Sequence, residues 1–256
     1  MLTFVGLGLY DERSITRRGA EALAGADAAF AEFYTSRLTG TDLATLEATH
    51  GVDIRVRDRA GVERDPDPIL EAAAEGEAVF LTGGDPMVST THVDLRLRAE
   101  DREIPTRVIH GTTAQTAASS LTGLQNYRFG KATTLPFPGT HGEAGVPDSV
   151  LETVRDNRER DLHTLVYLDI DAEAGVYMSG SLAARQLSAA GLEGAGVVVG
   201  QAGSDDPTVV ADALSALAEG AFGPPLHLLV VPAGLHPLER DALVGLAGAP
   251  EAALPD

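Results

Sequence analysis

The stretch that decides the fold is Phe4-Val5-Gly6-Leu7-Gly8-Leu9-Tyr10-Asp11-Glu12, near the start of the 256-residue chain. In it an apolar, strand-like run enters a glycine-rich turn, and a helix-like pattern follows. Gly83-Gly84-Asp85-Pro86-Met87-Val88 repeats this arrangement downstream. Glycine has no Cβ, so such turns let a ligand approach the bare backbone where a strand ends. The pair of turns therefore predicts a ligand site built on strand ends.

The two turns do not match the common phosphate-binding loops. The third glycine of a dinucleotide fingerprint would fall at position 11, which is Asp11, and the chain has no Walker A lysine loop. An aspartate in the second turn suits a cofactor that carries hydroxyl and amino groups but no phosphates. Asp85 would accept hydrogen bonds from such a ligand, or it would cap the turn that follows it. The sequence alone does not decide between ligand binding and turn capping for Asp85.

Short runs rich in Val, Leu and Ile alternate with alanine-rich amphipathic stretches along nearly the whole chain. This alternation predicts an α/β protein with largely parallel sheets. The expected strands are 2–5, 28–33, 78–81, 106–109, 132–135, 164–168, 196–199 and 226–231. The expected helices are 15–24, 42–48, 68–74, 91–99, 114–121, 148–158, 182–190, 208–217 and 237–246.

The polar, glycine-bearing segment His110-Gly111-Thr112-Thr113 is the expected domain boundary. It gives an N-terminal α/β domain over residues 1–110 and a C-terminal α/β domain over residues 111–256, with a frayed tail from about residue 250. The proline- and glycine-rich loop 136–142 is expected to be a flexible lid or an insertion.

The charge is strongly acidic, with 38 Asp and Glu against 19 Lys and Arg, and Lys131 is the single lysine. The acids are scattered and lysine is lost throughout, which favours adaptation to high salt over an acidic surface for a basic partner. No basic patch for nucleic acid, no apolar run of about 20 residues for a membrane and no basic-then-apolar signal pattern is present. The expected compartment is the cytoplasm.

Metal and hydrolase chemistry have little support. The chain has no cysteine, and its seven histidines show no HxH or HExxH spacing, so we expect no metal site. There is no GxSxG elbow for a hydrolase triad. One further polar cluster, Glu32-Phe33-Tyr34-Thr35-Ser36, lies at another expected strand end. Its residues would contact a ligand, or they would form a strand exit with Ser36 capping a helix.

Together these motifs resemble the diphthine synthase family of the archaeal and eukaryotic type, within the tetrapyrrole-methylase-like (class III) S-adenosylmethionine methyltransferases. The resemblance extends from residue 1 to about residue 249. The first two of the matching segments are the most specific to the family. The matching segments are Gly6-Leu7-Gly8-Leu9-Tyr10-Asp11-Glu12-Arg13, Ala31-Glu32-Phe33-Tyr34-Thr35-Ser36, Gly84-Asp85-Pro86, Ser89-Thr90-Thr91-His92, Leu124, Phe129-Gly130-Lys131, Leu162-His163-Thr164, Leu168-Asp169-Ile170 and Ala202-Gly203-Ser204.

The resemblance implies two α/β domains with S-adenosylmethionine in the cleft between them, and a homodimer. It implies that the cofactor contacts Leu9, Asp85, Val88, Thr113, Ala114, Leu168, Ala202 and His227. Two departures stand out. Thr113 replaces the usual serine and keeps its hydroxyl, whereas Gln201 replaces an arginine that family members commonly have.

The implied reaction is methylation of the amino group of a 3-amino-3-carboxypropyl-modified histidine on translation elongation factor 2, giving diphthine, trimethylated in the archaeal version. No residue is assigned as the catalytic base, and Glu32 and Tyr34 are candidates only for contact with the substrate. Two alternatives stay open. One is a sister methyltransferase that acts on a tetrapyrrole or on ribosomal RNA, which the missing basic patch disfavours. The other is a module that binds S-adenosylmethionine without catalysis.

Overall fold

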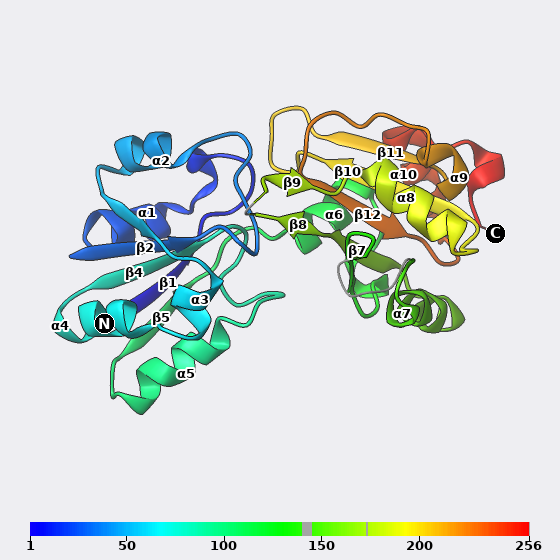
Figure 1. Ribbon diagram of the computed structural model, residues 1–256. Helices are drawn as coiled ribbons and strands as arrows, with labels where there is room; N and C mark the ends of the chain where they lie inside the picture. Colours follow the sequence, from blue (N-terminus) through cyan, green and yellow to red (C-terminus); the bar gives the residue numbers. More distant parts are fainter. Residues whose placement is uncertain (140–144, 173, 256) are drawn as a thin grey trace. The chain divides into compact units, whose positions relative to one another are not determined.

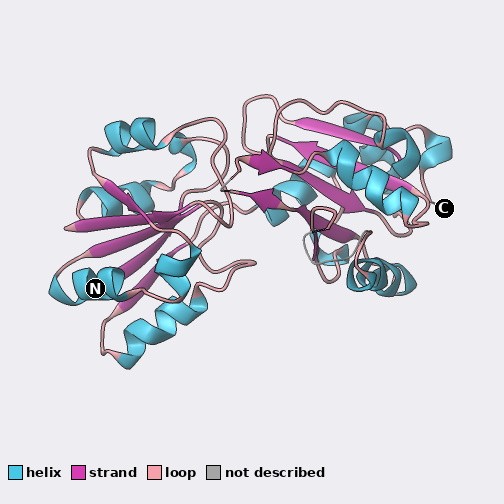
Figure 2. Cartoon of the chain, viewed as in Figure 1, coloured by secondary structure: helices cyan, strands magenta, loops and turns pink. Residues whose placement is uncertain are grey.

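The computed structural model describes residues 1–139, 145–172 and 174–255. The chain forms two compact units, Met1–Thr113 and Ala114–Asp256, so the division falls three residues after the boundary expected at residue 110. Each unit has its own five-stranded sheet with helices between the strands, which is the predicted α/β class (Figure 2). None of the described helices is both long enough and apolar enough to cross a membrane.

The first unit has a fully parallel sheet with the strand order β3-β2-β4-β1-β5. Its strands are β1 (Leu2–Gly6), β2 (Ala28–Glu32), β3 (Ile54–Val56), β4 (Ala78–Thr82) and β5 (Thr106–Ile109). Its helices are η1 (Glu12–Ser14), α1 (Arg17–Ala24), α2 (Leu43–His50), α3 (Arg59–Glu63), α4 (Asp67–Glu75) and α5 (Val93–Asp101). The short elements β3 and α3 were not expected from the sequence.

Helices cover both faces of this sheet (Figure 1). Phe4, Phe30 and Phe80 point to one face and pack with buried residues of α4 and α5. The intervening residues, such as Val5 and Val79, point to the other face and pack with α1 and α2. A strand covered on both faces must be apolar at successive positions, which is why β1 and β4 appear as continuous apolar runs in the sequence.

The second unit has a mixed sheet with the strand order β11-β10-β12-β7-β6. Its strands are β6 (Thr133–Leu135), β7 (Thr164–Leu168), β10 (Ala195–Gly200), β11 (Thr208–Ala213) and β12 (His227–Val231), beside a small pair, β8 (Ile170–Asp171) and β9 (Val176–Tyr177). Its helices are α6 (Ala114–Thr122), η2 (Asn126–Arg128), α7 (Asp148–Glu159), α8 (Gly180–Ala189), α9 (Leu214–Leu217), α10 (Pro237–Ala247) and η3 (Glu251–Ala253).

The prediction of largely parallel sheets is confirmed for the first unit and wrong for the second. Only β6 and β7 pair in parallel, whereas the other three pairings of the main sheet are antiparallel. The cause is the segment 208–217, which was expected to be a helix but forms β11 and the short α9. A parallel partner for β10 would need a crossover helix, and β11 instead follows β10 through a loop and pairs back with it.

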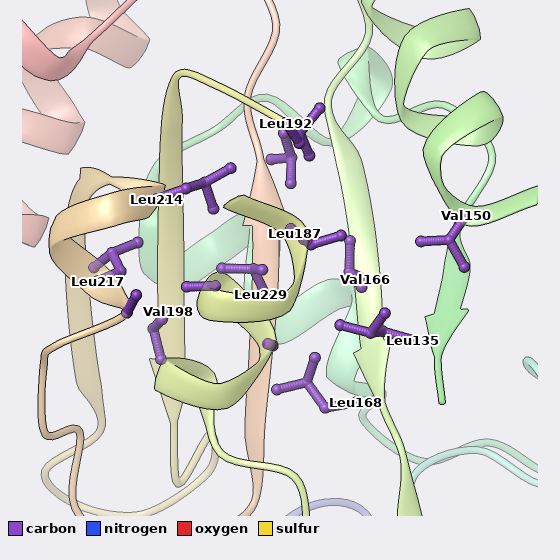
Figure 3. Close-up of a cluster of buried hydrophobic side chains, with 14 of the residues drawn as sticks. Leu135, Val150, Val166, Leu168, Leu187, Leu192, Val198, Leu214, Leu217 and Leu229 are labelled. Atoms are coloured by element: carbon purple, nitrogen blue, oxygen red, sulfur yellow. The ribbon is translucent and has the colours of Figure 1, made fainter. Parts of the chain in front are cut away.

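Two apolar clusters fill the second unit, one on each face of its sheet. On one face Leu135, Val166, Val198 and Leu229 pack with residues of α7, α8 and α9 (Figure 3). On the other face the intervening strand residues pack with α6 and α10.

The chain end differs from the frayed tail that the sequence predicts. Residues Glu251–Ala253 form η3, and Leu254 is buried in the cluster that contains α10. Of the expected lid, residues 136–139 are described. Phe137 packs against the core of the second unit, and its N–H donates to Asp169 Oδ2 at 2.9 Å. Residues 140–142 lie outside the described part of the chain, so the lid stays a prediction.

Candidate functional site

Three strand ends of the first unit meet at one edge of its sheet. β4, β1 and β5 are parallel neighbours, so the residues that follow them emerge together. Gly8 and Gly84 exchange backbone hydrogen bonds, with N···O distances of 3.2 and 2.8 Å. The two glycine turns singled out in the sequence are therefore joined. We call the residues that follow β1, β4 and β5 the first edge.

Glycine is required at this edge because the backbones approach closely. A Cβ on Gly6 would lie 2.4 Å from the carbonyl oxygen of Gly84, and a Cβ on Gly111 would lie 2.2 Å from the same oxygen. Gly84 itself has a φ of 71°, which favours glycine, and a Cβ there would meet only the Thr112 carbonyl oxygen, at 4.0 Å. A ligand can therefore reach the backbone of the second turn.

Asp85 connects two of the three strand ends. Its carboxylate is buried and accepts three hydrogen bonds: the Met87 N–H reaches Oδ1 at 2.9 Å, while His110 Nδ1 and the Gly111 N–H reach Oδ2 at 2.8 and 3.2 Å. The capping contact considered for Asp85 is thus present. The contact with His110 was not predicted from the sequence. One feature of the sequence could have revealed this contact. His110 directly follows an apolar strand, and that strand belongs to the same parallel sheet as the strand before Asp85.

The other predicted cofactor residues of the first unit lie on the same edge. Leu9 follows Gly8 and is half-buried, and Val88 is 39% exposed in the turn after β4. Thr113 is half-buried and ends the segment after β5. Leu9, Thr113 and the pair Asp85 and Val88 come from three separate segments, and one sheet places these segments at the same edge.

The second unit places three of its predicted residues at one edge as well. Leu168 ends β7, Ala202 follows β10 and His227 begins β12. The antiparallel register pairs Gly200 with His227 and Tyr167 with Leu228, so the end of β7, the start of β12 and the end of β10 coincide. We call this the second edge. The fourth residue, Ala114, begins α6 and packs against the cluster on one face of the same sheet.

The imidazole of His227 is engaged inside the second unit. Its Nδ1 accepts a hydrogen bond from the Gly180 N–H at 3.0 Å, and its Nε2 lies 3.2 Å from the Phe222 carbonyl oxygen. Burial lowers the pKa of His227 below its usual value of 6.5, although nearby carbonyls act in the opposite sense. The ring is therefore neutral and carries its proton on Nε2, and both of its nitrogens are engaged inside the second unit.

Glu32 is internal and does not face a ligand. Its fully buried carboxylate accepts hydrogen bonds from the N–H groups of Tyr34 and Thr35, both at 3.0 Å, and from Thr82 Oγ1 at 2.9 Å. These bonds hold the loop after β2 against the end of β4. Burial, and then the charge of Glu32, raise the pKa of the Tyr34 phenol, so this hydroxyl stays protonated. The suggestion that Glu32 contacts the substrate is wrong for this arrangement.

The first edge fits S-adenosylmethionine in its chemistry. It offers bare backbone at Gly84 and a carboxylate, Asp85, which accepts three hydrogen bonds and has lone-pair capacity for one more donor. The turn contains no lysine or arginine of the kind that a phosphate-bearing cofactor needs. No group of three metal-ligating side chains occurs among the described residues.

Comparisons with known proteins identify the family. The family model for tetrapyrrole (corrin/porphyrin) methylases matches residues 1–218. A protein named diphthine synthase from Natronomonas pharaonis is 63% identical over 100% of this chain and 99% of its own length. One from Halobacterium salinarum is 64% identical over 99% of this chain and 100% of its own. A crystal structure of a diphthine synthase, 36% identical, superimposes with a TM-score of 0.91 and covers 99% of both chains.

Proposed function

This chain belongs to the tetrapyrrole methylase family, as an S-adenosylmethionine-dependent methyltransferase of the diphthine synthase type in diphthamide biosynthesis, and from this premise we propose its acceptor and its site. The acceptor is the amino group of the 3-amino-3-carboxypropyl-modified histidine of translation elongation factor 2. The observation that supports this most strongly is the identity of over 60% with diphthine synthases along nearly the entire chain. The enzyme acts in the cytoplasm, where that factor works, and as a homodimer.

We also propose that both edges contribute to cofactor binding. In the first unit Leu9, Val88 and Thr113 line the cofactor and Asp85 accepts hydrogen bonds from it. In the second unit Ala114, Leu168, Ala202 and the backbone of His227 contact it. The small side chains of Ala114 and Ala202 and the bare backbone of Gly84 support the proposal, because they leave space for a ligand at the edge of each sheet.

Bound S-adenosylmethionine supplies a methyl group that its sulfonium already activates. The task left to the protein is to hold the acceptor amine in line with that methyl, and positioning of this kind can supply much of the acceleration. The close approach of the backbones at Gly6, Gly84 and Gly111 suits this task, because it brings the ends of three strands together at one edge.

Mass spectrometry of elongation factor 2 tests the acceptor. Factor that carries the aminocarboxypropyl histidine, incubated with enzyme and S-adenosylmethionine, should gain whole methyl increments on that histidine while S-adenosylhomocysteine is released. Unmodified factor should gain none, because its imidazole lies several bonds short of the methyl. Methylation of a tetrapyrrole or of ribosomal RNA with the modified factor inert would contradict the acceptor, and binding without turnover of any acceptor would contradict catalysis.

A further inference from the structure

A histidine with no role in the proposed cofactor site lies on the first edge. His110 directly follows β5, and its Nδ1 is 2.8 Å from Oδ2 of Asp85. The two side chains differ sharply in exposure, with 76% of the His110 side chain accessible and only 3% of the Asp85 side chain. A buried carboxylate therefore holds an imidazole that faces solvent beside the residues proposed to bind the cofactor.

The geometry fixes which ring nitrogen carries the proton. Asp85 is itself held by the Met87 and Gly111 N–H groups, and an ionised carboxylate can only accept hydrogen bonds. Nδ1 of His110 must then be the donor, so the lone pair of the neutral ring is on Nε2. Nε2 makes no hydrogen bond with any described residue. The same carboxylate–imidazole pairing sets the tautomer of the base in serine hydrolases.

The other described histidines do not have this combination of exposure, carboxylate contact and location. His92, His163 and His227 are buried. His50 Nε2 contacts the Glu12 carbonyl, and His236 Nδ1 accepts a bond from the Leu238 N–H at the start of α10. His141 lies outside the described residues. His110 alone among the described histidines is exposed, oriented by a carboxylate and located at a strand end of the first edge.

We propose that His110 accepts the proton that the acceptor amine must lose, and that Asp85 is its positioning residue. This inference rests on the proposed function, since it requires an amine acceptor. The substrate ammonium gives one proton to Nε2 of neutral His110, which frees the nitrogen lone pair. That lone pair forms the N–C bond as the C–S bond of the donor breaks and its electron pair stays on sulfur. The imidazolium then releases its proton to water, so the step balances and can repeat.

The first test replaces His110 and separates chemistry from binding. In single-turnover assays with the modified elongation factor 2, His110→Ala should lower the methylation rate by about 10²-fold or more. The dissociation constant for S-adenosylmethionine, measured by calorimetry, should stay unchanged. Added imidazole should restore part of the rate, because the exposed position leaves room for it. His110→Gln, which retains a donor toward Asp85, serves the same purpose if the alanine variant does not fold. The control His50→Ala should leave the rate unchanged.

The second test replaces the positioning residue. The Asp85→Asn side chain keeps its size, and with its oxygen in the Oδ2 position it still accepts from His110 Nδ1 and the Gly111 N–H, but it lacks the negative charge that stabilises the His110 imidazolium. Its rate should fall without rescue by imidazole, because the ring still occupies the position. At saturating S-adenosylmethionine, which offsets the loss of the proposed contact between Asp85 and the cofactor, Asp85→Asn combined with His110→Ala should slow the reaction no further than His110→Ala alone, since the two residues act as a unit in proton transfer.

Three outcomes would overturn the inference while leaving the proposed function intact. The first is that His110→Ala methylates the modified factor at the rate of the unaltered enzyme. The second is that it loses rate and cofactor affinity in the same proportion with no rescue, which would make His110 a binding residue. The third is that the two substitutions slow the reaction additively at saturating S-adenosylmethionine. Failure of the unaltered enzyme to methylate the modified factor would contradict the proposed function itself.

Discussion

At the scale of single residues, buried histidines set the response of the protein to acid. His163 is fully buried, with Nδ1 accepting from the Ala233 N–H at 3.1 Å and Nε2 lying 3.1 Å from Glu239. Burial lowers the pKa of His163 below 6.5, and it does the same for His92 and His227. Because these rings resist protonation in the folded state, the unfolded chain binds more protons than the folded one as the pH falls below 6.5.

We therefore expect the free energy of unfolding to fall as the pH is lowered from about 7.5 to about 5, the range in which unfolded histidines take up protons. Urea titrations at constant molar salt would measure it. His163→Gln can keep both hydrogen bonds without titrating, so its stability should fall less steeply with pH. His50→Gln, at the end of α2, is the control and should follow the unaltered protein. Equal slopes for all three proteins would remove His163 as a cause.

Glu239 adds a second step at lower pH. Burial alone would raise the pKa of this carboxyl, but hydrogen bonds from the Gln125 and His236 N–H groups and from His163 outweigh it, so the pKa lies below its usual 4.5. The stabilisation is present above pH 4.5 and is lost as the pH falls through the folded-state pKa.

Ala202 tests the second edge at the same scale. It is half-buried just after β10 and packs against the α6–α10 side of the core. A phenylalanine there would fill the space proposed for the cofactor, so Ala202→Phe should abolish S-adenosylmethionine binding in calorimetry while the far-ultraviolet circular dichroism stays native. A folded variant that binds as tightly as the unaltered protein would place Ala202 outside the site. Ala190→Phe, at the end of α8, provides a bulky substitution away from the second edge.

At the scale of elements, the close approach of three strand ends makes the first edge sensitive to a single methyl group. Gly111→Ala would place a Cβ 2.2 Å from the Gly84 carbonyl oxygen, so the segments that follow β4 and β5 must move apart. We expect a loss of about 1–3 kcal/mol in unfolding free energy, as overpacking typically costs, together with weaker cofactor binding. Urea unfolding and calorimetry measure the two effects.

The matched control for this substitution lies within α10. Gly245→Ala adds the same methyl group where nothing lies within 4 Å, and in a helix interior it should stabilise the protein by up to about 1 kcal/mol. If Gly111→Ala behaved like this control, the close approach would not constrain the first edge.

At the scale of the whole molecule, the net charge of −19 governs stability in salt. The similar proteins named above come from halophilic hosts, in agreement with the interpretation of the acidic composition. Because 38 carboxylates repel one another when unscreened, the melting temperature should rise from about 0.1 M salt, where the Debye length is about 10 Å, to molar salt. Sucrose at matched osmolality controls for solvent exclusion. A flat profile in salt would instead favour a basic partner.

The sequence by itself determined the α/β class, the paired glycine turns and most strands, because apolar periodicity and glycine spacing are local patterns that survive without the rest of the fold. It failed for 208–213, where β-branched Thr208, Val209 and Val210 form an edge strand whose partner, β10, decides its conformation. Only the tertiary structure brought Asp85 to His110, 25 residues apart, and buried Glu32 and Leu254. Such contacts depend on which strands become neighbours in a sheet, and no spacing within one segment encodes that choice.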